Sequence, residues 1–434
     1  MIKPKVSEWV MSVLIALLIM LGTTRNTFTL LAFGLCAVCV VLYNERSGLC
    51  ILMFIVSFAF VFKINPNSTS LFTFVFLLYV LWITVQHKHF ASLVGWIIIF
   101  ICYLVGVQCF NDTLNVTQTI KMLANLLFWY YTVELIEPGD YDKIYPFYIG
   151  GVITAAMAKL SGLFQNFDLY IGNKESYLMR FTSLHEDPNY FAVNVLIAMC
   201  LLVVLYHKKK TSLPVFLVLS GAFVYFISLT ASKSAFLMLF LPILLMLYSN
   251  AKNKRYFLQL SLLAGLLFFG LCLHLGKIEM FEKVLERFRE VDDIQEMTTG
   301  RAEHWKDYLS FSFSSVGNLF FGAGLGAPLY QGTAAHNSYA DCLYFMGTIG
   351  TVGIVVIVCM ILLNCNERCP GMHRNLLNLS VWMCIAMMYF FLSELNYFDM
   401  PFHIVIALMV WNEAIEPLWR KSRRGILRSL KATC

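Results

Sequence analysis

The chain has 434 residues, of which 59% are hydrophobic and 13% are charged, and its mean hydropathy is +0.71. Soluble domains are nearer half apolar and a quarter charged, so this composition excludes an ordinary soluble protein and indicates a polytopic membrane protein. The formal net charge of +6 does not indicate a nucleic-acid partner, because the basic residues are distributed by membrane side.

Apolar blocks follow one another along the chain and predict an all-α membrane protein. A transmembrane helix needs roughly 20 mostly apolar residues, and the blocks predict about 14 such helices in one membrane domain, residues 1–434. The block at 119–136 is the weakest of them. The blocks lie at 9–21, 27–43, 49–63, 71–86, 91–109, 119–136, 144–163, 189–206, 213–229, 233–248, 256–274, 338–363, 377–394 and 399–418.

The basic residues predict the orientation, because cytoplasmic loops carry an excess of Lys and Arg. With a cytoplasmic N-terminus, the basic clusters fall inside, and the short outer loops hold only scattered cations such as Lys63. Both termini are therefore expected in the cytoplasm. The inner clusters are 207–210, 252–255, Arg368 with Arg374, and the basic residues from Arg420 to Lys431. The outer loops are then 164–188, 230–233, 275–337 and 395–398.

The first polar outer segment runs from Arg180 to Phe191 and ends at the start of an expected helix. Asp187 is expected to cap that helix, with Pro188 at an early helical position where its missing N–H costs nothing. Capping alone would explain Asp187, Pro188 and Asn189. It does not explain Arg180, a cation beside the membrane with no local need, so this segment is a candidate part of a site.

The second segment, residues 228–235, is a tight polar break between two apolar blocks. Lys233 lies close to hydrocarbon there, which is costly unless its side chain snorkels to the surface or meets an anion. Snorkelling stays open as the plainer explanation. The alternative is an anionic ligand at the surface, supported by the hydroxyls of Ser232 and Ser234 and by a helix N-terminus.

The third segment is the loop 275–337, the one long polar segment between the apolar blocks of the chain. Its first part, 277–291, carries apolar residues at helical spacing and predicts an amphipathic helix on the outer interface. A second helix is expected to begin near Gly300. It places Arg301 and Trp305 four residues apart on one face.

The end of this loop holds a Gly-rich turn at 322–326 and then His336 and Asn337, which open the next membrane helix. A lone His at a helix start is more often structural than catalytic, but His336 shares its expected membrane side with Arg301 and Lys233, which favours catalysis. The outer side carries no Asp-x-Asp pair and no His, Asp or Glu cluster at metal-ligand spacing. No metal and no cofactor are therefore expected.

These motifs together resemble those of the O-antigen polymerase and O-antigen ligase superfamily. The resemblance covers about residues 176 to 355, including the outer loop. It is carried by Leu-Thr-Ala-Ser-Lys-Ser-Ala at 229–235, Gly300-Arg301 with Trp305 four residues after the Arg, Gly-Ala-Gly-Leu-Gly at 322–326, and His-Asn-Ser-Tyr at 336–339 before a helix containing Gly347 and Gly350.

The resemblance implies a GT-C-like fold and a metal-independent, inverting glycosyltransferase acting on glycans linked to undecaprenyl diphosphate. It implies that Lys233 and Arg301 hold the diphosphate and that His336 is the base. Lys233 stands where the family usually has Arg. Lys keeps the positive charge but lacks the planar guanidinium group, which can donate two parallel hydrogen bonds to a phosphate. Arg180 is a candidate to compensate, and Ser232, Asp187, Asn189, Trp305 and Asn337 are expected to support the site.

The leading prediction is a polymerase of surface-polysaccharide repeat units, O-antigen or capsule, at the outer face of the bacterial cytoplasmic membrane. The bilayer and the lipid-linked glycan are its expected partners, with a chain-length regulator and a flippase of the same pathway as further candidates. A ligase that transfers finished glycan to lipid A core or protein shares the motifs and stays open. A lipid-linked oligosaccharide flippase is the lesser alternative, since it would be expected to show repeated helix sets and short loops.

Overall fold

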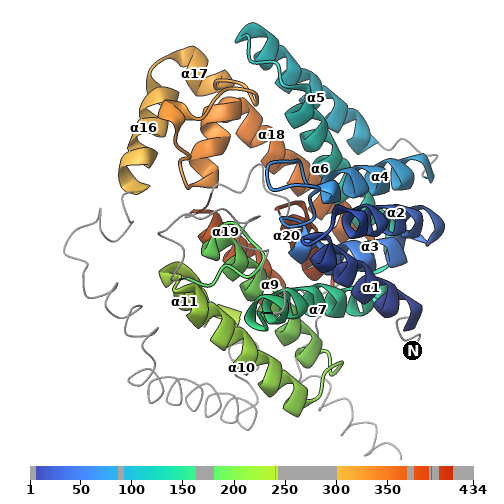
Figure 1. Cartoon of the computed structure of the whole chain (residues 1–434). Helices are drawn as coiled ribbons and strands as arrows, with labels where there is room; N and C mark the ends of the chain where they lie inside the picture. The colour runs from blue at the N-terminus through green and yellow to red at the C-terminus, as the bar shows by residue number, and fades with distance from the viewer. Residues whose placement is uncertain are drawn as a thin grey trace, which may run out of the picture.

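The computed structural model describes residues 6–86, 92–162, 180–239, 241–242, 301–368, 376–390, 392 and 400–413. In these ranges the regular elements are all helices (Figure 1). The α-helices are α1 (Val6–Gly22), α2 (Asn26–Leu42), α3 (Glu45–Ile55), α4 (Leu71–Gln86), α5 (Ser92–Phe110), α6 (Val116–Leu135), α7 (Tyr141–Leu160), α9 (Pro188–His207), α10 (Leu213–Thr230), α11 (Lys233–Met238), α16 (Arg301–Phe313), α17 (Val316–Phe321), α18 (Ser338–Arg368), α19 (Ser380–Tyr389) and α20 (Met400–Trp411). Short 3-10 turns lie at Val56–Phe58, Pro138–Asp140, Tyr330–Gly332 and Leu376–Leu379.

The expected helical class is confirmed for the described part of the chain, whereas the number of spans stays a prediction. Four described helices are long and apolar enough to cross a membrane: Leu93–Phe110, Pro188–His207, Leu213–Thr230 and Ser338–Asn364. Five further apolar helices have 10–17 residues. The expected block at 256–274 and the amphipathic helix at 277–291 lie outside the described residues, and the block at 233–248 is described only in part.

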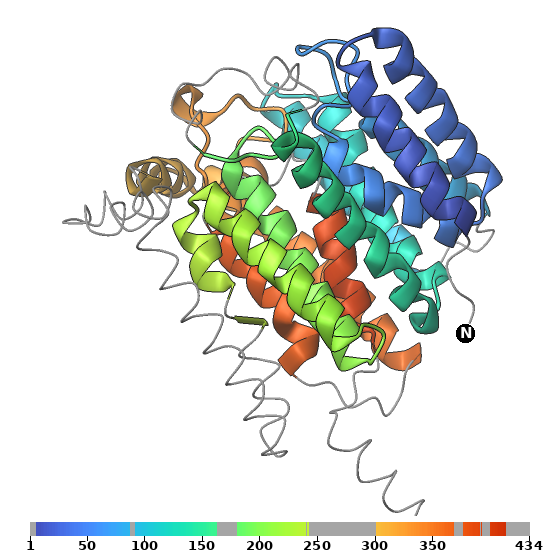
Figure 2. The ribbon, with the colours of Figure 1, turned by 60° about the horizontal axis from the view of Figure 1, so that its bottom comes forward.

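The most enclosed of the four span-length helices is α9, in which every residue except Tyr190 and Tyr206 is buried. Its sequence is apolar on all sides, which is the pattern of a helix surrounded by other helices. It packs against α7, α10, α11 and α19. Figure 2 shows α9 and α10 running side by side, with α19 and α20 next to them.

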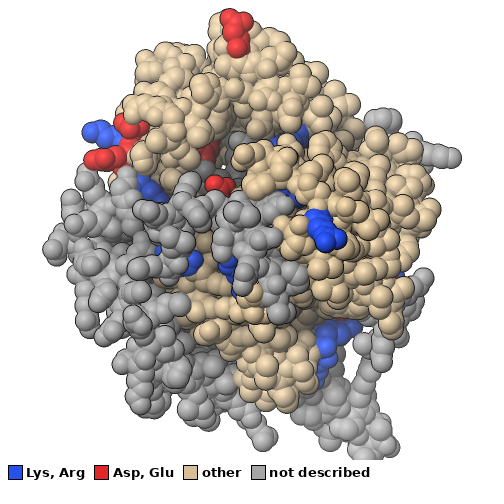
Figure 3. Space-filling view, viewed as in Figure 1, with Lys and Arg blue, Asp and Glu red and all other residues tan. Residues whose placement is uncertain are grey.

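Other helices present large apolar side chains to the outside. Examples are Trp96, Ile98 and Ile99 of α5, which are 53%, 49% and 60% exposed, and Val352 and Val355 of α18, which are 57% and 56% exposed. Charged side chains are sparse over the described surface in Figure 3. Such broad exposed apolar surface is what helices facing lipid present.

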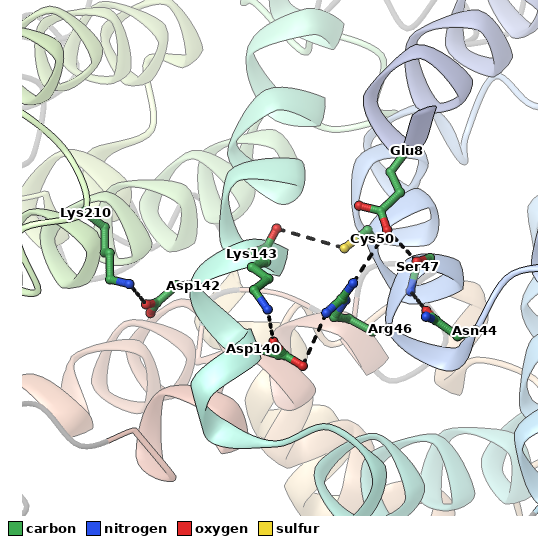
Figure 4. Close-up of polar contacts among 9 residues, drawn as sticks. All are labelled: Glu8, Asn44, Arg46, Ser47, Cys50, Asp140, Asp142, Lys143 and Lys210. Atoms are coloured by element: carbon green, nitrogen blue, oxygen red, sulfur yellow. Dashed lines mark hydrogen bonds and ion pairs between the residues drawn. The ribbon is translucent and has the colours of Figure 1, made fainter. Parts of the chain in front are cut away.

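Ion pairs tie one end of the bundle together. Lys208, directly after α9, pairs with Asp142 of α7 and lies 2.6 Å from Glu413, which follows α20. Lys210 adds a contact of 2.7 Å to Asp142 (Figure 4). The end of α9, the start of α7 and the end of α20 therefore lie together.

The starts of α1 and α3 join the same end. Arg46 of α3 lies 3.9 Å from the Glu8 carboxylate of α1 and 3.4 Å from that of Asp140, just before α7 (Figure 4). Ser47 donates a hydrogen bond of 2.5 Å to Glu8. Since α9 has 20 residues, at 1.5 Å per residue it is about 30 Å long, and its start lies at the opposite end of the bundle.

Replacing Lys208 by Met should destabilise the fold. Asp142 and the fully buried carboxylate of Glu413 would lose their shared cation, and removing one partner of a buried pair costs about 2–4 kcal/mol when the pair is not wholly enclosed. We expect a lower midpoint of thermal unfolding in detergent.

Lys209→Met is the matched control, because it removes the same charge from an exposed neighbour. Adding Glu413→Gln to Lys208→Met should recover part of the loss, since the two residues interact directly. Equal stability of the two single variants would show that these ion pairs do not hold α7, α9 and α20 together.

Candidate functional site

Arg180 joins the first two polar segments. Its Nε donates a hydrogen bond of 2.8 Å to the carbonyl oxygen of Thr230, and an Nη donates one of 3.2 Å to Oδ1 of Asn189. The next residue, Phe181, donates its N–H to the carbonyl of Leu229 at 3.0 Å. The guanidinium is therefore held between the end of α10 and the first turn of α9.

Asp187 caps α9, as the sequence predicts. Its side chain accepts a hydrogen bond of 2.7 Å from the N–H of Asn189, and Pro188 occupies the first helical position. The structural role predicted for this segment is confirmed. Asn189 also receives Arg180, so capping is not its only contact.

The second segment reverses direction through Ala231, whose φ of +49° is left-handed. Ser232 then caps α11 by accepting a hydrogen bond of 3.5 Å from the N–H of Ala235. Lys233 is the first residue of α11, and its side chain lies outside the described part of the structure. Because α11 packs against α9 and α19, the backbone of Lys233 lies near the same end of the bundle as Arg180.

Arg301 and Trp305 lie in the first turns of α16, and both are half-buried. The Trp305 ring packs edge-to-face on Phe390, directly after α19, with ring centroids 4.9 Å apart. Such aromatic pairs contribute about 0.5–1.5 kcal/mol beyond their buried area. Trp305 therefore holds the Arg301 end of α16 against the end of α19.

The Gly-rich turn is clamped to α18 by backbone hydrogen bonds. The N–H groups of Ala323 and Gly324 donate to the carbonyls of Tyr344 and Phe345, at 2.7 and 2.9 Å. Those carbonyls are available because α18 is kinked at Gly347, whose φ is +64°. The predicted turn is present, and its glycines allow the backbone of the loop to lie directly on a helix.

An aromatic cluster fixes the segment between this turn and His336. It consists of Tyr308, Phe311, Tyr330 and Tyr344, whose ring centroids are 4.8–6.0 Å apart. Tyr308 donates its hydroxyl to the carbonyl of Thr333 at 2.7 Å. Burial, aided by the charge of Asp341, raises the pKa of Tyr308 to about 12, so this hydroxyl stays a neutral donor.

His336 is a half-buried residue in the left-handed conformation, with φ +52°. Asn337 follows and caps α18, its Oδ1 accepting from the N–H groups of Tyr339 and Ala340 at 3.0 and 3.1 Å. The hydroxyl of Ser338 donates to the carbonyl of Leu392 at 2.6 Å. The backbone that carries His336 is thus fixed from both sides, by the cap of α18 and by the segment after α19.

These contacts gather most of the predicted site around one end of α9 and α19. Arg180 reaches α9, α11 packs on α9 and α19, and both Trp305 and Ser338 contact the residues after α19. Figure 3 shows a hollow in the face beside α18, with acidic and basic side chains around it. In these contacts Arg180 reaches α9 and α10, whereas the residues next to His336 reach α18 and the segment after α19.

The structure adds a lysine and a glutamate to the Arg180 end. Lys63 is only 9% exposed, and its Nζ lies 3.9 Å from the centroid of the Phe60 ring. Burial lowers the pKa of Lys63, while the charge of Glu186 opposes that shift, so the two groups interact. Sequence reasoning placed Lys63 on the outer side but assigned it no role, because nothing in a short loop shows which distant acid influences its charge.

His185, in the same segment, is 2% exposed, and its burial lowers its pKa to about 3. It is therefore neutral at ordinary pH and adds no positive charge. Further along the chain, within α9, Oδ1 of Asn194 accepts hydrogen bonds from the hydroxyl of Tyr148 at 2.5 Å and from Nε2 of His403 at 3.2 Å. Nδ1 of His403 then accepts from Tyr389 at 3.2 Å.

Sequence reasoning passed over Asn194 and His403, although a signal was present. Each is a polar residue inside a predicted apolar block, and polar groups at membrane depth are rare and often functional. Here they satisfy one another's hydrogen bonds within the bundle, which is a sufficient structural reason for them.

Replacing Gly347 by Ala should disrupt the clamp between the Gly-rich turn and α18. A Cβ at Gly347 would lie 2.3 Å from the carbonyl oxygen of Phe320, and overpacking of this kind costs about 1–3 kcal/mol. We expect a lower midpoint of thermal unfolding in detergent.

Gly332→Ala separates this clash from backbone strain. Gly332 also has a positive φ, +76°, but a Cβ there meets nothing within 4 Å. The excess loss in Gly347→Ala over Gly332→Ala combines the close approach with the strain of ψ −175° at Gly347, a backbone region that is essentially restricted to Gly. An excess of zero would contradict the close approach.

Comparison with family models finds no match to this chain, and searches of curated proteins and of solved structures find none either. The resemblance to the O-antigen polymerase and ligase superfamily therefore stays a prediction from the motif residues.

Proposed function

We propose that the protein is a membrane glycosyltransferase that polymerises oligosaccharide repeat units carried on undecaprenyl diphosphate. The observation that carries the proposal is the gathering of Arg180, the start of α11 and the His336–Asn337 junction around one end of α9 and α19. Three separate segments supply these groups. A structural role for each segment alone gives no reason for all three to carry a basic residue near this end.

The diphosphate would bind at the cationic part of this assembly. Arg180 and Arg301 offer planar guanidinium groups that match phosphate oxygens, and Lys233 offers a point charge. The N-terminus of α9, beside Arg180, adds a partial positive charge. Cations aimed at the leaving diphosphate stabilise the transition state in which its negative charge develops.

His336 would accept the proton of the acceptor hydroxyl. That oxygen attacks the anomeric carbon of the donor sugar from the side opposite the diphosphate, and the carbon–oxygen bond to the diphosphate breaks with inversion. The leaving diphosphate keeps the electron pair and needs no proton. A neutral imidazole is a suitable base near pH 7, and the fixed backbone of His336 holds it in one place.

The site would lie at the outer face of the bacterial cytoplasmic membrane, with both termini in the cytoplasm. The opposite end of the bundle carries Arg46, Lys143, Lys208 and Lys210. An excess of basic residues marks the cytoplasmic side of membrane proteins. A GT-C-like fold, which rests on the resemblance, and about 14 spans, which rest on the apolar blocks, belong to the same proposal.

The catalytic assignment predicts that His336→Asn and Arg301→Ala each lower polymer synthesis by about 100-fold or more, with unchanged amounts of protein in the membrane. Asn tolerates the left-handed conformation, so the first variant removes the base and keeps the backbone. The measurement is polymer yield and length in a strain that lacks the wild-type gene.

Two variants control for the position of each change. Gln331→Asn makes the same kind of replacement at an exposed residue with the same φ of +52°, and Lys306→Ala removes an exposed cation from the same helix as Arg301. Wild-type polymer from either site variant would refute its assigned role.

The acceptor separates a polymerase from a ligase, since both share the motifs. We expect a deletion strain to accumulate single repeat units transferred to the normal acceptor, because chain growth would fail while attachment continued. Long polymer that is unattached in such a strain would instead identify a ligase. Lipid-linked units retained on the cytoplasmic side would identify a flippase.

A further inference from the structure

A row of exposed apolar side chains lies on the outer loop, at the junction of α16 and α17. Its members, which we call the α17 patch, are Phe313, Val316, Phe320 and Phe321, exposed by 66%, 74%, 44% and 45%. The patch lies in a stretch without any Asp, Glu, Lys or Arg between Asp307 and Asp341. Exposed apolar residues grouped in this way need a partner.

The end of α17 lies against the kink of α18. The carbonyl oxygen of Phe320 is so close to Gly347 that a Cβ there would lie 2.3 Å away. The hydroxyl of Tyr103 donates to the carbonyls of both Phe320, at 3.3 Å, and Met346, at 2.9 Å. The α17 patch is therefore at the level of Gly347 along α18.

That level coincides with the start of the lipid-facing part of α18. The helix has 31 residues, about 46 Å, which exceeds the roughly 30 Å of bilayer hydrocarbon. Before Gly347 the one large apolar side chain exposed on the described helix is Tyr339. The exposed ones after it are Ile349, Val352, Val355, Val356 and Leu363. The part after Gly347 is itself about 30 Å long, so Gly347 marks the membrane surface.

The end of α5 marks the same surface independently. Phe110, Leu114 and Val116, at the turn from α5 to α6, are exposed by 85%, 55% and 60%. In that turn Asn111 donates its Nδ2 to the carbonyl of Gly322 at 3.0 Å, directly after α17. Figure 1 shows the end of α5 close to α17. The α17 patch is thus continuous with the lipid-facing surfaces of α5 and α18.

We propose that α17 lies in the bilayer surface, with the α17 patch inserted among the acyl chains of the leaflet opposite the Lys208 end of the bundle. Apolar and aromatic residues at this depth reach about 5–10 Å into the boundary between headgroups and acyl chains. The charged residues Glu303, Lys306 and Asp307 belong to the earlier turns of α16 and stay in water. The loop is then anchored to the membrane surface by α17, and this inference does not depend on the proposed catalytic activity.

The test replaces Val316 by an environment-sensitive fluorescent amino acid through codon suppression, which leaves the native cysteines in place. The protein is reconstituted in vesicles of phosphatidylethanolamine and phosphatidylglycerol. Quenching is measured with lipids that carry a nitroxide near the headgroup, with lipids that carry it near the terminal methyl, and with aqueous iodide. Phe313 is the second probe position, used in the same way should the Val316 variant not fold.

Two control positions give the reference signals for a probe in water and for a probe in the bilayer interior. Lys306, exposed on α16, reports water, and Val355, exposed on α18 beyond Gly347, reports the bilayer interior. We expect the Val316 probe to emit at shorter wavelength than the Lys306 probe and to be quenched most by the shallow nitroxide, while the Val355 probe is quenched most by the deep one.

Two results would overturn the proposal. Emission and iodide quenching equal to those at Lys306 would place the α17 patch in water. Short-wavelength emission without quenching by either nitroxide lipid would mean that protein, such as a second copy of the chain, covers it.

Discussion

In a helix that other helices enclose, polar side chains need partners from the surrounding elements as well as from the helix itself, and α9 is such a helix. At its start Asp187 caps the first turn and Asn189 receives Arg180. In its second turn Asn194 joins Tyr148 and His403, and at its end Lys208 joins Asp142 and Glu413. Polar groups without partners are costly at membrane depth. These contacts therefore specify how α7, α10 and α20 are arranged around α9.

The described part of the long polar loop, residues 301–337, is held by a different kind of interaction. Backbone hydrogen bonds join Ala323 and Gly324 to the kinked part of α18, and aromatic rings around Tyr308 hold the segment that leads to His336. None of these contacts needs a charge. Neutral groups therefore fix the Gly-rich turn and the segment that leads to His336.

The backbone of His336 connects the contacts of the loop with those of the buried helix α9. Its left-handed backbone, which costs roughly 1–2 kcal/mol for a residue other than Gly, lies between the aromatic segment and the Asn337 cap of α18. Ser338 is bonded to the carbonyl of Leu392 after α19, and α19 packs on α9. The position of His336 therefore depends on the buried helix as well as on the loop, and strain of this kind persists where surrounding contacts determine the backbone.

The sequence by itself determined the helical membrane class, because long apolar blocks have no other stable structure in a bilayer. It also determined the Asp187 cap and the turn at Gly322–Gly326, since both depend on residue types within a few positions of each other. Only the tertiary structure showed that Arg180 meets Asn189 and Thr230, that the charge of Glu186 acts on Lys63, and that Asn194 meets His403. These pairs join residues on different helices and loops, and their partners follow from how the helices pack, which apolar blocks of similar composition do not specify.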